Sequence, residues 1–301
     1  MSLKQSPCKD EIIAEAKRLG FYKIGFAKVR SVEKASASQY ADWISVGCHG
    51  EMSYLDRYHD VRNNPQQLLP SAKTIIVCAA SYYPAKKQSI ELPQIATYAL
   101  GRDYHEVLRE RLMLLADFVG GETRVCVDTA PLRERYWAVQ AGVGFVGRNS
   151  QLIIPDAGSY FFLGEILTSI EFPADTPLTQ SCLECGRCVD SCPGNAIIGN
   201  GAIDARRCLS YLTIEYKGDF PEGFSLGNRL YGCDECQAVC PHNSTPIFTS
   251  IPDFEPSDEL LSLDKKTISE LTPELFSMIF RHSAIKRTKL MGLLRNLKAL
   301  D

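Results

Sequence analysis

The chain has 301 residues, 45% of them hydrophobic, and a formal net charge of −3. That length allows a large hydrophobic core, in one large domain or in one large and one small domain. The charge excludes a generally basic surface, so a nucleic-acid partner would have to meet a local basic patch. The opening segment has no apolar signal core and no twin arginine, and no stretch is long enough to span a membrane, so we expect a soluble cytoplasmic protein.

Helix-like and strand-like patterns alternate through the first 172 residues. Residues 10–19 have helical periodicity and end at Gly20, and residues 104–119 form a second amphipathic pattern. Pro131 suits the first turn of a third helix, which we expect to run to about Ala141. Apolar runs predict strands at residues 21–29, 74–83, 124–128, 151–155 and 159–172, the last two joined by a turn at 156–158.

Three segments follow from these patterns. Residues 1–172 are expected to form an α/β or α+β domain, and the PADTP sequence at 173–177 marks its end. Residues 173–250 hold most of the cysteines and should fold as short helices and turns around metal. Residues 251–301 have a helical pattern, and from residue 281 to 300 this tail carries six Lys or Arg and no acid.

Eight of the twelve cysteines lie between residues 182 and 240, and their spacing predicts two [4Fe–4S] clusters. The runs are Cys182-x2-Cys185-x2-Cys188-x3-Cys192-Pro193 and Cys208 followed by Cys233-x2-Cys236-x3-Cys240-Pro241. In this pattern three cysteines bind one cubane, and the cysteine before proline binds the other cluster. The predicted ligands are Cys182, Cys185, Cys188 and Cys240 for cluster one, and Cys192, Cys208, Cys233 and Cys236 for cluster two. A pair of structural zincs is the alternative, but zinc ribbons do not repeat CxxxCP.

Residues 127–167, VDTAPLRERYWAVQAGVGFVGRNSQLIIPDAGSYFFLGEIL, followed by the cysteine cassette, resemble epoxyqueuosine reductase. GEMSYLDR at 50–57, YALGRDYH at 98–105 and AIKRTKLMGLLRN at 284–296 extend the resemblance over nearly the whole chain. The resemblance implies a nitroreductase-like domain that holds base-off cobalamin and a ferredoxin-like domain that reduces it. The implied reaction removes the epoxide oxygen of epoxyqueuosine in the tRNA anticodon loop and leaves the cyclopentene of queuosine.

Asp128 occupies the position of the proton donor that the resemblance implies. It follows a predicted buried strand, where a side chain at the carboxyl end can project into a pocket. The alternative role is a helix cap, but Asp128 lies too far upstream of a helix that begins at Pro131. To act as an acid near neutral pH, Asp128 needs a raised pKa, from burial or from the substrate.

The resemblance also places corrin contacts, which the chemistry of corrin amides and phosphate supports. The candidates are Arg57, Tyr98, Asp128, Asn149, Gln151, Ser159, Ser210, Asp234 and Glu235. Singly, each has a simpler reading, such as a surface ion pair for Arg57 or a helix cap for Ser210. The cobalamin motif D-x-H-x-x-G is absent, because Leu108 stands at its glycine position, so we expect His105 to be structural.

The basic tail suits RNA phosphates, although a solvated helix face is the simpler reading of any one residue. The candidate tRNA contacts are Tyr216, Lys217, Arg281, Lys286, Arg287, Lys289 and Arg295. Many family members continue into a HEAT-like repeat, whereas this chain stops at Asp301, as a natural short form or a truncated chain. A flavodoxin or ferredoxin is the expected electron donor, and a monomer is the expected state. A corrinoid reductive dehalogenase and an electron-transfer or corrinoid-reactivating protein are the alternative functions.

Overall fold

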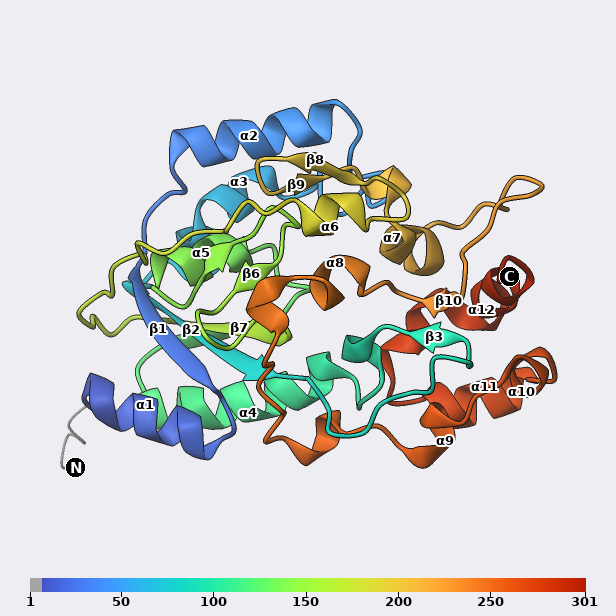
Figure 1. Cartoon of the computed structure of the whole chain (residues 1–301). Helices are drawn as coiled ribbons and strands as arrows, with labels where there is room; N and C mark the ends of the chain where they lie inside the picture. The colour runs from blue at the N-terminus through green and yellow to red at the C-terminus, as the bar shows by residue number, and fades with distance from the viewer. Residues whose placement is uncertain (1–6) are drawn as a thin grey trace.

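The computed structural model describes residues 7–301, and at its centre lies a four-stranded antiparallel sheet (Figure 1). The strands lie in the order β1 (Lys23–Lys28), β2 (Thr74–Ser81), β7 (Phe161–Thr168) and β4 (Thr123–Cys126). β7 pairs with β2 on one side and with β4 on the other. Four of the five predicted strands therefore lie in this sheet. Residues 1–6 lie outside the described part, so the absence of a signal segment stays a prediction.

Helices cover both faces of this sheet and complete its core. α1 (Lys9–Arg18) and α4 (Tyr104–Val119) pack on one face, and α5 (Glu134–Gln140) packs on the other, near α2 (Lys34–Ser45) and α3 (His59–Asn63) (Figure 1). Side chains of a strand alternate between the two faces of the sheet, and helices cover both faces here. Every residue of β2 is therefore buried, and its sequence is a continuous apolar run. The periodicity at residues 10–19 and 104–119 thus predicted both helices of one face correctly.

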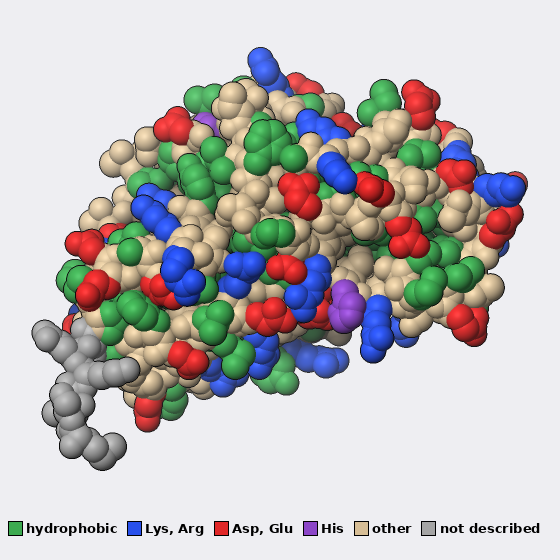
Figure 2. Space-filling model, turned by 90° about the horizontal axis from the view of Figure 1, so that it is seen from below, with side chains coloured by type: hydrophobic (Ala, Val, Ile, Leu, Met, Phe, Trp, Pro, Cys, Tyr) green, Lys and Arg blue, Asp and Glu red, His purple; other side chains and the backbone are tan. Residues whose placement is uncertain are grey.

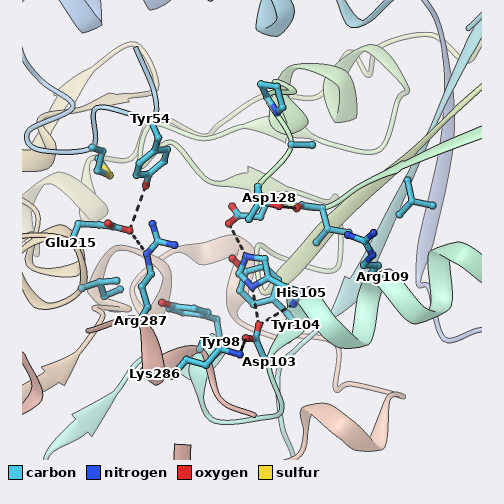
Figure 3. A pocket seen from close by; sticks show the side chains of 18 of the residues that line it. Tyr54, Tyr98, Asp103, Tyr104, His105, Arg109, Asp128, Glu215, Lys286 and Arg287 are labelled. Carbon is cyan, nitrogen blue, oxygen red and sulfur yellow. Dashed lines mark hydrogen bonds and ion pairs between the residues drawn. The ribbon is translucent and has the colours of Figure 1, made fainter. Parts of the chain in front are cut away.

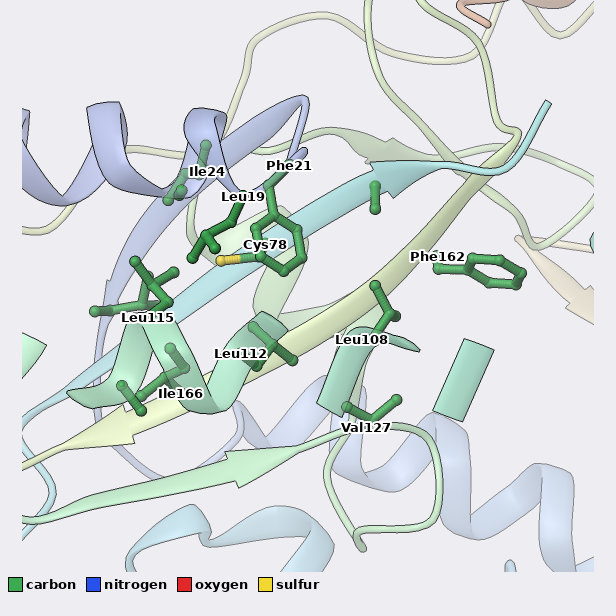
Figure 4. Packing of buried hydrophobic residues seen from close by; sticks show 14 of the residues in the cluster. Leu19, Phe21, Ile24, Cys78, Leu108, Leu112, Leu115, Val127, Phe162 and Ile166 are labelled. Carbon is green, nitrogen blue, oxygen red and sulfur yellow. The ribbon is translucent and has the colours of Figure 1, made fainter. Parts of the chain in front are cut away.

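The core between α4 and the sheet depends on close packing around Leu112 (Figure 4). Leu112 is fully buried, and a Cβ at Gly164 of β7 would lie 2.5 Å from its Cδ1 atom. Leu112→Ala should therefore lower the free energy of unfolding by about 2–5 kcal/mol, through lost burial and a cavity. Denaturant unfolding measures this change. Leu114→Ala, at an exposed position of the same helix, should cost less than about 0.5 kcal/mol, and equal losses in the two variants would contradict the packing argument.

Two local predictions differ from the structure. The helix expected from Pro131 begins at Glu134, and residues 128–133 form an irregular loop instead. In that loop Asp128 has φ +48°, which a helix cannot contain. The expected hairpin of residues 151–155 and 159–172 is also wrong in its pairing. The turn is present, but β6 (Leu152–Ile153) pairs with β5 (Phe145–Val146), whereas β7 joins the central sheet.

The cysteine-rich segment consists of short elements, as its spacing predicted. They are α6 (Arg187–Asp190), β8 (Ile197–Gly199), β9 (Ala202–Ile203), α7 (Leu209–Ile214), β10 (Arg229–Tyr231) and α8 (Glu235–Ala238), with 3₁₀ turns at Ala205–Arg207 and Pro241–Asn243. The four other cysteines are not part of this segment. Cys48, Cys78 and Cys126 are buried, as expected of small apolar residues, but Cys8 is exposed.

The tail is helical, as predicted, and it packs back onto the rest of the chain. It contains α9 (Asp258–Leu261), α10 (Lys265–Ser269), α11 (Pro273–Phe280) and α12 (Lys289–Lys298), with 3₁₀ turns at Pro252–Phe254 and Ala284–Thr288. One apolar cluster joins Leu293 of α12 to Tyr231 of β10 and to Leu100, near the 3₁₀ turn Thr97–Ala99. β10 also pairs in parallel with β3 (Gln94–Ile95). The three-segment division stays a prediction, and contacts cross both of its borders.

Within residues 7–301, no helix combines the length and the apolar character needed to cross a membrane.

Candidate active site

A cavity of about 1200 Å³ lies between the sheet, the cysteine-rich segment and the tail (Figure 3). Its wall is built from the start of α4, the loop after β4, the start of α7 and the 3₁₀ turn at Ala284–Thr288. Cys208, one of the predicted cluster ligands, also lines it. Pockets for small molecules usually measure about 300–1,000 Å³, so this cavity has room for a large cofactor beside part of a substrate.

Asp128 lies at this cavity, on the loop after β4. Its backbone N–H donates to Oε1 of Glu134 at 2.6 Å, which holds the residue in its left-handed conformation. The side chain is 47% exposed and points toward His105, whose Nε2 donates to Asp128 Oδ2 at 2.9 Å (Figure 3). The carboxyl group is therefore positioned from both sides and still reaches the cavity.

His105 bridges Asp128 to a second carboxylate, that of Asp103. The ring Nδ1 donates to Asp103 Oδ1 at 2.8 Å, and Lys286 approaches Asp103 Oδ2 at 2.8 Å from the tail. The Tyr104 ring stacks on the imidazole, with ring centroids 4.0 Å apart. Asp103 also caps α4 by accepting the His105 backbone N–H, so the same residue starts the helix and orients the ring.

These contacts set the charges at the site. Burial opposes a charge on His105, but hydrogen bonds to the two aspartates outweigh it and raise its pKa to about 9. Burial alone would raise the pKa of Asp128, but the hydrogen bond and charge of His105 lower it below its usual value. Burial therefore does not supply the raised pKa that Asp128 needs as an acid, and the substrate stays the other predicted source. At neutral pH the pair is a carboxylate and an imidazolium, and its mobile proton lies on His105.

His105 was predicted to be structural, because Leu108 replaces the glycine of the cobalamin motif D-x-H-x-x-G. Its place beside Asp128 was therefore missed. The Asp103-x-His105 spacing at the start of a predicted helix was the available signal. It puts a cap residue and a histidine on the same turn, but it does not indicate that Asp128 lies opposite.

A second ion pair forms the facing wall of the cavity (Figure 3). Arg287 Nε donates to Glu215 Oε1 at 2.6 Å, and Tyr54 Oη donates to the same oxygen at 3.4 Å. The guanidinium also lies over the Tyr54 ring, 5.6 Å from its centroid. Arg287 remains 44% exposed, so it can still meet an anionic group in the cavity.

The predicted corrin-binding residues divide into two groups. Tyr98, Asp128 and Ser210 line the cavity. The structure places the other six outside the cavity wall: Arg57, Asn149, Gln151, Ser159, Asp234 and Glu235. Arg57 is exposed on the loop before α3. Direct corrin contacts by these six stay a prediction.

Several of these six hold the cluster segment against the sheet domain. Asn149 Nδ2 donates to the carbonyl of Cys236 at 3.1 Å, and its Oδ1 accepts the backbone N–H of Gln151. Ser159 Oγ donates to Gln237 at 2.9 Å in a buried network. Asp234 accepts the backbone N–H of Thr97 at 2.7 Å, and Glu235 pairs with Arg229.

The predicted tRNA contacts divide into residues at the cavity, exposed residues and one residue that bonds to a neighbouring segment. Lys286 and Arg287 line the cavity, where acidic partners hold them. Arg281, Lys289 and Lys217 are exposed and Tyr216 is half-buried. Arg295 instead donates to the carbonyls of Tyr216 and Gly218 at 2.6 and 2.9 Å. On the face seen from below, basic and acidic side chains are interspersed, as Figure 2 shows.

The electrostatic interactions among the eight cysteines agree with the two predicted groups, and the assignment of each cysteine to a cluster stays a prediction. Besides burial, the charges of Cys182, Cys240 and Cys185 raise the pKa of the Cys188 thiol. Burial and the charges of Cys233, Cys208 and Cys192 likewise raise the pKa of Cys236. Within residues 7–301, no three His, Cys, Asp or Glu side chains are arranged around a single metal ion. The grouping fits two cubanes, and Cys208 brings the second group to the cavity.

Two protein-family models match the chain. Residues 181–243 match the 4Fe-4S double cluster binding domain, and residues 62–129 match the family described as epoxyqueuosine reductase QueG, DUF1730. An epoxyqueuosine reductase from Cellulophaga algicola is 38% identical over 298 residues, and the match covers 97% of this chain and 97% of that protein.

Solved structures of epoxyqueuosine reductases have the same fold. One, in complex with an epoxyqueuosine-modified tRNA-Tyr stem loop, matches with a TM-score of 0.86 and 33% identity, over 96% of this chain and 79% of that one. The Bacillus subtilis enzyme, solved with its catalytic aspartate loop swung out of the active site, matches with a TM-score of 0.84 and 33% identity, with the same coverage. The predicted pairing of a nitroreductase-like domain with a ferredoxin-like two-cluster domain is confirmed by these matches.

Proposed function

The chain belongs to the epoxyqueuosine reductase family, and on this premise we propose that it reduces epoxyqueuosine in the anticodon loop of tRNA to queuosine. As a member of that family it is an oxidoreductase that uses cobalamin and two [4Fe–4S] clusters. The observation that supports the proposal most directly is the placement of Asp128, paired with His105, in a cavity that Cys208 also lines.

The residues present fit these cofactors. The cavity volume suits a corrin, Tyr98 and Ser210 supply polar atoms on its wall, and Cys208 belongs to the cysteine group of cluster two. Cobalamin bound here would supply, in its reduced form, a low-valent cobalt nucleophile for the epoxide carbon. We infer that cluster two is the cluster beside the corrin, because its ligand Cys208 and Ser210 share that wall.

The proton chemistry belongs to the chain itself. When a C–O bond of the epoxide breaks, negative charge develops on the oxygen, and a positioned acid stabilises it by giving a proton. We propose that Asp128 takes up the proton of His105 Nε2, at 2.9 Å, and gives it to this oxygen. Asp103 and Tyr104 keep the imidazole in line, and the Glu134 bond keeps the Asp128 loop turned inward. Because the pKa of Asp128 is lowered in the free protein, we propose that its carboxylate takes up this proton only when the substrate is bound.

We further propose that the basic residues near the cavity bind the anticodon arm. Arg287 and Lys286 lie at the cavity, and Arg281 and Lys289 are exposed close to them in sequence. Lys217 is exposed on a separate segment, after α7, which Arg295 supports by donating to the Tyr216 carbonyl. These phosphate contacts should make tRNA binding weaken as salt rises. We also propose a cytoplasmic monomer that receives electrons from a flavodoxin or ferredoxin.

The function is tested by incubating the reconstituted protein with cobalamin, a reductant and tRNA that carries epoxyqueuosine. Nucleosides from the digested tRNA are then measured by mass spectrometry. We expect queuosine to replace epoxyqueuosine, and a chlorinated phenol in a parallel reaction to keep its chlorine. Persistence of epoxyqueuosine with loss of chloride would instead assign the dehalogenase activity.

His105→Gln should lower turnover by about 10²–10⁴-fold, because it removes the group that protonates Asp128. In the parent protein, turnover should fall as pH rises through about 9, where the imidazolium loses its proton. This decline should be absent in His105→Gln. The measurement is turnover from pH 7 to 10 at saturating tRNA. His282→Gln, at an exposed histidine, is the control, and an unchanged decline in His105→Gln would contradict the assignment.

A further inference from the structure

Tyr54 is an aromatic residue of the cavity wall that the mechanism above does not use. Its side chain lies on the side of the cavity opposite Asp128 and His105 (Figure 3). Five tyrosines line the cavity, and among them the Tyr54 ring stands out because it is 41% exposed. The other four are buried or half-buried: Tyr98, Tyr104, Tyr211 and Tyr231. Tyr54 therefore offers the cavity a flat apolar surface on which a planar ligand can stack.

The loop that carries Tyr54, between α2 and α3, is fixed on both sides of the residue. The backbone N–H of Glu51 donates to Tyr211 Oη at 2.8 Å, which ties the loop to α7. The carbonyl of Tyr54 itself accepts a hydrogen bond from Arg62 Nη2 at 3.1 Å. A Cβ at Gly50 would lie 2.6 Å from the Tyr211 ring, so the loop and α7 are in close contact. The ring is thus held in place before a ligand enters, which lowers the entropy lost on binding.

The contacts of the ring itself leave it open to the cavity. Tyr54 Oη donates to Glu215 Oε1 at 3.4 Å, and the Arg287 guanidinium lies 5.6 Å from the ring centroid. Arg287 is itself 44% exposed, so a cation and an aromatic surface stand side by side at the cavity. Proteins that bind unstacked RNA bases combine these two groups, with the base on the aromatic ring and the cation near the phosphate.

The proposed reaction requires a site for an unstacked base. The epoxide is carried by a base of the anticodon loop, and an enzyme that acts on a base takes it out of its stack. The stacking lost in the RNA is then replaced by contacts with the protein. Asp128 has to reach the epoxide oxygen from one side, so the base must be held from another part of the wall.

We propose that Tyr54 is the residue on which the modified base of the tRNA stacks, and that it holds this base while the epoxide faces Asp128. The inference rests on the proposed function, because it assigns the base-binding part of the same site. Stacking uses the face of the base and not its edge, so plain guanine at the same position should also bind. An RNA that lacks the base should bind more weakly.

The test measures binding of the anticodon stem loop to the protein loaded with clusters and cobalamin, by filter binding of labelled RNA. One stem loop carries guanine at the position of the modified base, and the other has no base there. We expect the parent protein to bind the abasic stem loop about 5–100-fold more weakly. Tyr54→Leu should bind the guanine stem loop as weakly as the parent binds the abasic one, and should not distinguish the two RNAs.

Two further variants serve as controls. Tyr54→Phe keeps the ring and loses only the hydroxyl that donates to Glu215, so it should discriminate as the parent does. Tyr22→Leu should also match the parent, because Tyr22 is 40% exposed but lies outside the cavity wall. Undiminished discrimination in Tyr54→Leu would overturn the proposal. Equal binding of the two stem loops by the parent would overturn it as well, even if Tyr54→Leu does not fold.

Cobalamin binding and turnover separate the remaining explanations. The visible spectrum should show the same cobalamin content in Tyr54→Leu and in the parent. Weaker cobalamin binding together with unchanged discrimination between the RNAs would place the ring against the cofactor and overturn the proposal. A parent protein that discriminates the two stem loops but leaves epoxyqueuosine unchanged in tRNA would count against the proposed function instead.

Discussion

Asp128→Asn should lower the turnover of epoxyqueuosine by about 10²–10⁴-fold and leave both clusters and cobalamin binding intact. Asparagine has the same shape and keeps the backbone N–H that donates to Glu134, so the loop should stay in place. It cannot give a proton to the departing oxygen or receive one from His105. The measurement is the rate of queuosine formation, with iron content and the visible spectrum of bound cobalamin determined on the same samples.

A matched control for this variant is Asp156→Asn. Asp156 is also an exposed aspartate with a left-handed backbone, at φ +60°, and it lies outside the wall of the cavity. Any effect of placing asparagine in this conformation would appear in both variants. Comparable rates for Asp128→Asn and Asp156→Asn would remove Asp128 from the mechanism.

Replacing the cysteine before proline in one run should remove the cluster whose other three ligands lie mainly in the other run. Cys240→Ser should cost the cluster of Cys182, Cys185 and Cys188, although Cys240 lies in the second run of the sequence. Cys192→Ser should cost the cluster of Cys208, Cys233 and Cys236. The physical reason is the grouping of the sulfurs, in which each run contributes its last cysteine to the other group.

Electron paramagnetic resonance of the reduced variants, with iron counted per chain, separates these outcomes. Each variant should keep about half of the iron and lose turnover, because we propose that electrons reach the corrin through both clusters. Cys8→Ser, at an exposed cysteine outside both groups, should keep all of the iron. If Cys240→Ser lost the signal of the cluster that Cys208 binds, the interleaved assignment would be wrong.

Much of the fold follows from the sequence because its patterns are local. The periodicity of residues 104–119 reflects a helix with one apolar face, and the continuous apolar run of residues 74–83 reflects a strand buried on both faces. The spacing of Cys182, Cys185 and Cys188 is local too, since a short turn brings their sulfurs within reach of one cubane. These features needed no knowledge of distant contacts.

The length of the loop between β4 and α5 could not be predicted from a local pattern. Pro131 is acceptable in the first turn of a helix, but the bond from Asp128 to Glu134 and the positive φ of Asp128 delay the helix to Glu134. The propensity of proline for the first turn favours a helix start at Pro131 but does not exclude a later start. The contact between Asp128 and Glu134 decided for the later one.

The sequence by itself determined the four strands of the central sheet and the helices α1 and α4, and it predicted the two cysteine groups and Asp128 as the candidate acid. Only the tertiary structure decided that His105 faces Asp128, that Arg295 supports a neighbouring segment and that Tyr54 lines the cavity opposite Asp128. His105 and Asp128 are 23 residues apart, and Lys286 is more than 150 residues from both. Their charges and pKa values depend on contacts between distant elements, and no local pattern encodes which side chains those elements bring together.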